Sequence, residues 1–487
     1  MKRCLALLLT AVLLGLVPFA GAAFKDEKII SDPYRAAVEE MAGSGVISGF
    51  TDGSFGPKKT LTRAQAAKIL CVLLEGSEKA EALEKTETGF ADVPATHWAA
   101  KYVAYCVEKG IVAGVGSGKF NPDGKLSAAA FAKMLLVAYG QDASKFTGAD
   151  WEKNVQDAVG AAYINNKVST FNARSLPREE AAQMAWNAQF AHDAETAATK
   201  DMASRPMPNG VPESLKLYAV GNSFSNNCMI GPLYDMLKSV GVKNLTMANL
   251  YKSGCPLQQH LKNAMSDESV YTYWKRTDSD KEWVRNDNWS FNKAMTDEDW
   301  DIVSFQQTPS AGYQPAKNRV MYYLQKAHPD ANFVWNIIWA HAKTSKQGAF
   351  LETWKGDQMA MYQGMIDLAK EHVLPDPRIR FAAPTGTAIQ NARTSFLGDN
   401  LDRDGYHLNK GVGYYIAAMV WCCKLTGLTP DKIDYVPDDL TKYPPHGFDK
   451  KTPGLREALI AVAKESVTNA LANPYEITQS KLTTAPG

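Results

Sequence analysis

The stretch that most constrains the fold is an apolar run that ends in a tight polar turn. Residues Leu215–Val220 predict a short strand that leads into Gly221, and Cys228–Val240 predicts a helix. Glycine lets the chain turn sharply, and a serine on a strand-to-helix turn has the exposure that a nucleophile needs. The N–H groups at a helix start can hold a developing negative charge. Ser223 is therefore a candidate nucleophile, and the alternative is a polar helix cap.

Strands and helices continue to alternate after this turn. Strands are predicted at residues 244–250, 301–305, 332–338 and 379–383, and helices at 317–327, 358–372 and 411–425. This alternation predicts an α/β fold with a parallel sheet and helices on both of its faces. Sites in such sheets lie at the carboxyl ends of the strands. Ser223, Gly254, Gln306 and Trp339 each follow a predicted strand, so we expect them to converge.

A second chemical motif lies far downstream, where Asp404 precedes His407 by three residues. One loop could then carry a general base and the carboxylate that orients it. The alternative is an Asx-turn beside a solvated histidine. The run from Asn400 through Asp402 imitates the start of a calcium loop, but its twelfth position is Gly411 instead of glutamate, so no metal is expected.

These two stretches carry a family resemblance. Gly221-Asn-Ser-Phe-Ser225 resembles the Gly-Asp-Ser-Leu block of SGNH (GDSL-type) hydrolases, and Asp404-Gly-Tyr-His407 resembles their C-terminal Asp-x-x-His block. The resemblance covers roughly residues 215–475 and implies a flavodoxin-like α/β fold. It also implies a serine hydrolase without cofactors, in which Ser223 attacks, His407 is the base and Asp404 orients it.

The same resemblance implies an oxyanion hole built from three donors. Two would be the backbone N–H groups of Ser223 and Gly254. The third is normally an Asn from a Gly-x-Asn-Asp block, whereas this chain has Phe305-Gln-Gln-Thr-Pro-Ser310. A glutamine amide can donate the same hydrogen bond, so the role is assigned to Gln306, with Gln307 as the alternative.

Residues 24–195 contain an internal repeat. Glycine-rich turns at Gly45–Phe55 and Gly110–Phe120 each precede a helix start, capped by Thr62 and Ser127, and a weaker third copy has its cap at Ser175. The copies span approximately 24–76, 88–140 and 146–195. The pattern resembles the S-layer homology domain, which implies an all-α three-repeat bundle that binds pyruvylated secondary cell-wall polysaccharide.

In that family an arginine contacts the acidic polymer, and Arg63 and Arg178 match its position. Arginine is suited to a bidentate grip on a carboxylate. Ala128 occupies the position in the second copy, so a weakened second groove is expected. The alternative is that both arginines are solvated helix-start residues. Trp98 and Trp151 are expected in the core more than as ligand platforms.

The remaining segments frame these two regions. A basic start, an apolar run and an Ala-x-Ala site predict a signal peptide over residues 1–23. Residues 196–214, which are rich in proline, predict a linker, and residues 476–487 predict a loose polar tail. No other run of about 18 apolar residues occurs, so no transmembrane segment is expected in the mature chain. A net charge of +1 gives no reason to expect a nucleic-acid partner.

Two further features leave alternatives open. The six cysteines beyond the leader are expected to be buried thiols, and Cys228 with Cys255 is the favoured pair if a disulfide exists. Segments Tyr271–Arg276 and Glu282–Arg285 predict a hairpin. Its tryptophans could roof the active site over a sugar, or the hairpin could be a packed insertion.

Together these features predict a secreted, cell-wall-attached serine esterase of Gram-positive bacteria. Its substrate would be an O-acylated polysaccharide or glycan, because the repeats place the enzyme among polysaccharides. One alternative is a non-catalytic carbohydrate-binding protein that keeps the SGNH fold. Another is a structural S-layer component whose C-terminal domain serves assembly.

Overall fold

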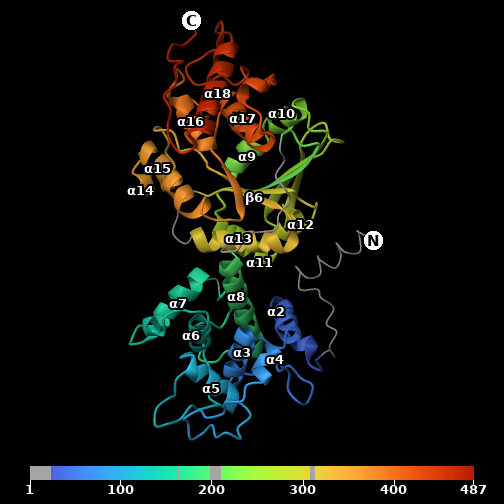
Figure 1. Cartoon of the computed structure of the whole chain (residues 1–487), viewed down its shortest axis with the longest axis vertical. Coiled ribbons are helices and arrows are strands. Elements are labelled where there is room, and N and C mark those ends of the chain that lie inside the picture. The colour runs from blue at the N-terminus through green and yellow to red at the C-terminus, as the bar shows by residue number, and fades with distance from the viewer. Residues whose placement is uncertain (1–23, 163, 198–209, 308–312, 487) are drawn as a thin grey trace. The chain divides into compact units, whose positions relative to one another are not determined.

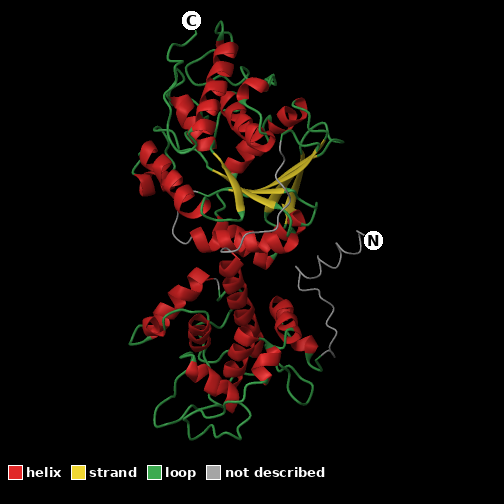
Figure 2. Cartoon of the chain, in the orientation of Figure 1, coloured by secondary structure: helices red, strands yellow, loops and turns green. Residues whose placement is uncertain are grey.

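The computed structural model describes residues 24–162, 164–197, 210–307 and 313–486. The chain divides into two compact units, Met1–Thr196 and Ala197–Gly487, called here the helical unit and the sheet unit. All the strands that the structure describes belong to the sheet unit (Figure 2). The predicted signal peptide and most of the predicted linker lie outside the described residues.

The helical unit consists of helices joined by glycine-rich turns (Figure 1). Its helices are α2 (Asp32–Gly43), α3 (Arg63–Glu75), α4 (Ser77–Glu81), α5 (Ala100–Glu108), α6 (Ala128–Ala138), α7 (Trp151–Ala162) and α8 (Arg178–Ala197), with 3-10 turns η1 (Glu27–Ile29) and η2 (Ala143–Phe146). Thr62 caps α3 through a capping box, and the Ser127 hydroxyl accepts from Ala130 N at the start of α6. The predicted third cap is wrong, because α8 begins at Arg178 and Ser175 lies three residues earlier.

A ring of backbone hydrogen bonds joins the three repeats. Leu61 N donates to Leu176 O at 2.9 Å, Leu176 N to Leu126 O at 2.8 Å, and Leu126 N to Leu61 O at 3.0 Å. All three leucines are buried. The ring closes on itself, so each copy occupies an equivalent place around a pseudo-threefold axis and the third, weaker copy completes it.

The sheet unit holds one seven-stranded sheet in the order β4-β3-β2-β1-β5-β6-β7. The strands are β1 (Ser214–Gly221), β2 (Asn244–Tyr251), β3 (Tyr271–Arg276), β4 (Val284–Trp289), β5 (Ile302–Phe305), β6 (Asn332–Asn336) and β7 (Ile379–Ala383). Strands β2, β1, β5, β6 and β7 are parallel, whereas β3 and β4 are antiparallel. The sheet is therefore mixed: five strands have the expected parallel order, and the predicted hairpin adds an antiparallel edge.

Helices cover both faces of the sheet (Figure 1). One face carries α11 (Leu257–Ser266), α12 (Phe291–Met295) and α13 (Tyr313–Ala327), and the other carries α9 (Ser223–Met229), α10 (Leu233–Ser239), α16 (Thr385–Arg393), α17 (Val412–Thr426) and α18 (Leu455–Ala472). Helices α14 (Gly348–Trp354) and α15 (Gln358–Leu368), the π-helical turn η3 (Ala369–Val373) and the 3-10 turn η4 (Pro430–Lys432) complete the unit. The helix predicted over 228–240 is two helices, since Gly231-Pro232 separates α9 from α10.

The hairpin of β3 and β4 does not roof the predicted active site. Arg276, at the end of β3, pairs with Met247 in the middle of β2, and Asp278 in the hairpin turn accepts from Leu245 N, near the start of β2, at 3.0 Å. The turn therefore lies at the amino end of the parallel strands, away from Ser223. Trp300, which follows the hairpin, is buried and stacks on Tyr218 with ring centroids 5.1 Å apart.

The C-terminal segment is not the loose tail that its composition predicts. Phe396 N donates to Leu482 O at 2.9 Å, and Thr478 N donates to Asn391 Oδ1 at 2.8 Å. Asn391 belongs to α16, so main-chain hydrogen bonds fasten residues beyond 476 to the sheet unit.

Candidate active site and wall-binding grooves

Ser223 is the first residue of α9, directly after β1. Asn222 caps this helix, and its Oδ1 accepts from Phe224 N at 3.1 Å. A Cβ at Gly221 would lie 2.6 Å from Ser225 Oγ, so only glycine fits where the strand turns into the helix. The half-buried Ser223 is thus presented at the carboxyl end of the sheet, where a nucleophile of this fold class is expected.

Asp404 and His407 form a close pair. Asp404 Oδ2 lies 2.6 Å from His407 Nδ1, and Asp404 Oδ1 accepts from His407 N at 2.8 Å. Burial acts to raise the pKa of Asp404, but hydrogen bonds from the His407 ring and backbone outweigh it and leave this pKa below its ordinary value. An ionised carboxylate on Nδ1 leaves Nε2 as the basic atom of the ring.

Asn227 links the serine helix to the histidine loop. Its Oδ1 accepts from Leu408 N at 2.9 Å, and its Nδ2 donates to Ser223 O at 2.8 Å. Trp339 adds a second link, because its Nε1 donates to Tyr406 O at 2.7 Å. Two segments about 180 residues apart in the chain are thereby fixed beside each other. Within the described ranges, no hydrogen bond joins the Ser223 hydroxyl to the His407 ring; such contacts are often long before substrate binds.

The predicted oxyanion donors gather around Asn222. Gln306 Nε2 donates to Asn222 Oδ1 at 2.7 Å, and Asn222 Nδ2 donates to Cys255 O at 3.4 Å, beside Gly254. Gln307 Oε1 instead accepts from Leu257 N at 2.9 Å, at the start of α11. The side chain of Gln306, and not that of Gln307, thus lies against the serine turn.

Sequence reasoning assigned no role to Asn222 or Asn227, which hold this site together, whereas Trp339 lies beside the site as expected from its place after a predicted strand. Asn227 carried a usable signal, since a residue four positions after Ser223 lies on the same helix face. His341 packs behind the site against the rings of Phe224 and Tyr406. Burial lowers the pKa of His341 to about 4, so it is neutral near pH 7, which fits a packing role.

In the ranges that the structure describes, no group of three or more His, Cys, Asp or Glu side chains could hold a metal ion. None of the helices in those ranges combines the length and the apolar character needed to cross a bilayer.

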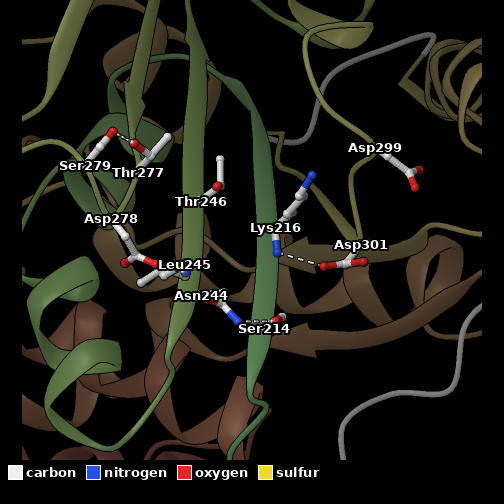
Figure 3. A pocket seen from close by; sticks show the side chains of 10 residues that line it. All are labelled: Ser214, Lys216, Asn244, Leu245, Thr246, Thr277, Asp278, Ser279, Asp299 and Asp301. Atoms are coloured by element: carbon white, nitrogen blue, oxygen red, sulfur yellow. Dashed lines mark hydrogen bonds between the residues drawn. The ribbon is translucent and has the colours of Figure 1, made fainter. Parts of the chain in front are cut away.

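A polar pocket of about 500 Å³ lies at the other end of the sheet, where β1 and β2 begin (Figure 3). Its lining includes Lys216, Asp278 and Asp301. Both carboxylates accept backbone hydrogen bonds there: Asp301 from Lys216 N at 2.8 Å, and Asp278 from Leu245 N. This end is opposite the serine turn, so the pocket is separate from the candidate active site.

In the helical unit, two arginines make matching contacts across repeat boundaries. Arg178 donates from Nε to Phe55 O at 2.9 Å and from Nη2 to Ser48 O at 2.7 Å. Arg63 donates from Nε to Phe120 O at 2.8 Å and from Nη2 to Ala113 O at 2.7 Å. Burial lowers the pKa of both guanidinium groups, for Arg178 to about 10. The alternative of a solvated helix-start residue is wrong for Arg178, which is 3% exposed.

Each arginine lines a groove. Groove 1, of about 420 Å³, contains Arg178, Lys68 and Trp98, and groove 2, of about 360 Å³, contains Arg63, Lys133 and Trp151. Lys68 and Lys133 hold equivalent places on α3 and α6. Trp98 is 54% exposed, so the expectation of a core tryptophan is wrong there.

The position of Ala128 has a different consequence from the one predicted. Arg178 of the third copy donates hydrogen bonds to the turn of the first copy, and Arg63 of the first copy donates to the turn of the second. Each arginine therefore bonds the turn of the next copy around the axis, so an arginine at position 128 would bond the turn of the third copy. The missing arginine therefore affects the third groove and not the second.

Comparisons with known proteins follow the same division of the chain. Residues 23–67 and 89–132 match the S-layer homology domain, and residues 216–444 match a domain of unknown function (DUF4886). A surface-layer 125 kDa protein of Lysinibacillus sphaericus is 36% identical over 126 residues, which are 26% of this chain and 10% of that protein. A cellulosome-anchoring protein of Acetivibrio thermocellus is 29% identical over 149 residues, 29% of this chain and 33% of that protein.

S-layer protein EA1 of Bacillus anthracis is 32% identical over 141 residues, 28% of this chain and 16% of that protein. The chain thus spans a third or less of the length of these curated relatives. A crystal structure of a DUF4886 family protein from Bacteroides uniformis shares 28% identity over 56% of this chain and 100% of its own length, with a TM-score of 0.49.

The repeats and these relatives define a cell-wall-attached surface protein of Gram-positive bacteria. Its helical unit carries S-layer homology repeats, and its sheet unit carries a DUF4886 domain.

Proposed function

We propose that the sheet unit is a serine esterase that removes O-acetyl or other acyl esters from a polysaccharide or glycan. The observation that carries the proposal is the Asp404–His407 pair, tied through Asn227 to the helix that begins at Ser223. A carboxylate, an imidazole and a hydroxyl on adjoining segments are the parts that acyl transfer to serine requires.

In the proposed reaction, Ser223 Oγ attacks the ester carbonyl while His407 Nε2 takes its proton. Asp404 stabilises the imidazolium that forms. The oxyanion of the tetrahedral intermediate receives hydrogen bonds from the N–H groups of Ser223 and Gly254 and from Gln306 Nε2. His407 then protonates the leaving alcohol, and a water molecule that His407 deprotonates releases the acid and restores Ser223.

The substrate class follows from the location of the protein. Grooves 1 and 2 each combine a guanidinium, an ammonium group and an indole ring, a set that suits an anionic sugar polymer. We propose that both grooves bind the pyruvylated secondary polysaccharide of the wall. An esterase held in this way would meet acylated polysaccharides at high local concentration.

Labelling with a fluorophosphonate, followed by peptide mapping, tests the esterase proposal. We expect one modified residue, Ser223, and no labelling of Ser223→Ala. Ser225 lies two positions away but is buried, with its hydroxyl bonded to Asn249, so Ser225→Ala serves as the matched control that should still be labelled. A wild-type chain that stays unlabelled while folded would contradict the proposal.

A second candidate is a non-catalytic carbohydrate-binding protein. The observation in its favour is that the Gln306 amide already donates to Asn222, which occupies one of its two hydrogens. This candidate predicts saturable binding of a glycan without hydrolysis of any acetyl ester. The structural S-layer alternative predicts instead that the purified chain forms an ordered lattice.

A further inference from the structure

Two cysteines of the helical unit face each other across the packed helices α3 and α5. Cys71 Sγ lies 3.8 Å from Cys106 Sγ, and both side chains are fully buried. Each sulfur also lies near a carbonyl of the opposite helix, Cys71 near Tyr102 O and Cys106 near Ala67 O. The other four cysteines are also buried and free, but no comparable sulfur–sulfur contact occurs elsewhere in the part of the chain that the structure describes.

We propose that Cys71 and Cys106 form a disulfide that links the first repeat to the second. A disulfide has a sulfur–sulfur distance of about 2.0 Å, so the two atoms must approach by roughly 1.8 Å (3.8 Å less 2.0 Å), a shift that side-chain rotation can supply. A wall-attached protein works outside the cytoplasm, where disulfides persist. The sequence favoured Cys228 with Cys255. In the structure, however, Cys228 Sγ accepts a hydrogen bond from Asn336 Nδ2, and Cys255 Sγ donates one to Pro256 O.

The chemistry requires an external oxidant. Each thiol loses a proton and an electron, one S–S bond forms, and the two electrons reduce the disulfide of an extracytoplasmic thiol–disulfide oxidoreductase to a dithiol through a mixed disulfide. Contact with Cys106 and burial raise the pKa of the Cys71 thiol well above its ordinary value. Both thiols are also fully buried, so an oxidoreductase reaches them more readily before α3 packs on α5.

The bond would stabilise groove 1 in particular. Helix α3 carries Lys68 into this groove, and Trp98 enters it two residues before α5 begins. Cys71 and Cys106 thus join the two elements that supply the ammonium and indole walls. A link between them fixes the width of the groove under extracellular conditions.

Thiol counting on the full chain, produced in an oxidising compartment, tests the assignment. The protein is denatured in an alkylating agent without reductant, digested and analysed by mass spectrometry. We expect a linked peptide pair containing Cys71 and Cys106, 2 Da lighter than the two thiol peptides, and alkylation of the other four cysteines beyond the predicted leader. Alkylation of all six cysteines beyond the leader, or a link between Cys228 and Cys255 in place of this one, would overturn the proposal.

Thermal unfolding of a single sequence in two redox states provides the second readout. The wild-type chain from an oxidising compartment should unfold in its helical unit at a Tm on the order of 10 °C above the same chain produced in a reducing cytosol. Cys71→Ala/Cys106→Ala should show no difference between the two sources. The matched buried pair Cys422→Ala/Cys423→Ala should keep the difference. Equal Tm values for the two wild-type samples would contradict the stabilising role.

Discussion

The two units place their functional groups by opposite means. In the helical unit, the groove arginines are also structural, because each guanidinium bonds two carbonyls of the neighbouring repeat. In the sheet unit, Ser223 bonds little with its side chain, and amides of Asn222 and Asn227 hold its surroundings. A groove arginine therefore cannot be removed without loss of fold stability, whereas the proposed nucleophile can.

Removal of the proposed nucleophile should have the largest effect. Ser223→Ala should abolish ester hydrolysis, with a loss of at least about 10⁴-fold, because no other group can form the acyl-enzyme. His407→Ala should be nearly as damaging, and Asp404→Asn should misorient the ring. Rates on a small acetyl ester test this, with circular dichroism as the control for folding. A Ser223→Ala protein as active as wild type would show that Ser223 is a helix cap.

The oxyanion assignment should give the next largest effect. Gln306→Ala should slow turnover by about 10²–10³-fold with little change in KM, since its amide acts in the transition state. Gln307→Ala, the neighbouring control, removes the acceptor for Leu257 N and should affect stability more than kcat. If Gln307→Ala slows turnover and Gln306→Ala does not, the oxyanion donor is Gln307 instead of Gln306.

Asn227 tests whether the link between the two segments matters for rate. Asn227→Leu keeps the approximate size but removes both hydrogen bonds, so kcat should fall by roughly 10–100-fold as His407 loses its position. Because Asn227 is a positioning residue, the binding of a non-hydrolysable substrate should change little. A fall in both kcat and binding, with a lower Tm, would indicate a purely structural role.

The grooves should respond differently from the sheet site. Arg178→Ala should cost roughly 2–4 kcal/mol of stability in the helical unit, because it leaves the buried carbonyl of Phe55 without a donor and also removes the hydrogen bond to Ser48 O. It should also weaken wall binding. Arg63→Ala should cost less, because Arg63 is less buried. Chemical denaturation and co-sedimentation with purified wall measure the two effects. If the double variant Arg63→Ala/Arg178→Ala is folded and still binds the wall as wild type does, the groove assignment is contradicted.

Lys68→Met separates binding from folding in groove 1. Lys68 pairs with the half-exposed Glu81 at 2.9 Å, and its loss should change stability little. Wall binding should weaken several-fold, because Lys68 lines the groove and its positive charge would attract an anionic polymer. Lys85→Met removes another exposed ion pair, to Glu108, away from both grooves and serves as the matched control.

The last prediction concerns the stability of the sheet unit at acid pH. Burial lowers the pKa of His260 to about 3 and that of His341 to about 4, so both remain neutral in the folded sheet unit while the unfolded chain protonates them below about pH 6.5. Stability should therefore fall as pH drops from 6.5 towards 4, by about 1.4 kcal/mol for each histidine between pH 7.5 and 5.5. Urea denaturation at the two pH values measures this loss of stability. In His341→Gln the loss should be smaller by the contribution of one histidine, about 1.4 kcal/mol.

Local sequence was sufficient wherever neighbours in the chain decide the structure. The capping box at Thr62, the strand at Ile379–Ala383 and the turn at Ser223 follow from side chains within a few residues. The Asp404–His407 contact belongs to the same class, because three residues of loop bring the two groups together. The sequence therefore predicted the candidate triad residues, the strands to within a few residues, and helices α13, α15 and α17, but it did not predict helices α11, α12, α14, α16 and α18.

Tertiary packing decided everything that joins distant segments. The direction of the β3–β4 hairpin, the ring of Leu61, Leu126 and Leu176, and the facing sulfurs of Cys71 and Cys106 depend on which surfaces pack together. Asn227 likewise binds Leu408 only because α9 lies beside the loop that precedes α17. The periodicity of apolar residues does not predict such contacts. It indicates which face of a helix or strand is buried, whereas the residue that each side chain contacts depends on how two buried faces pack together.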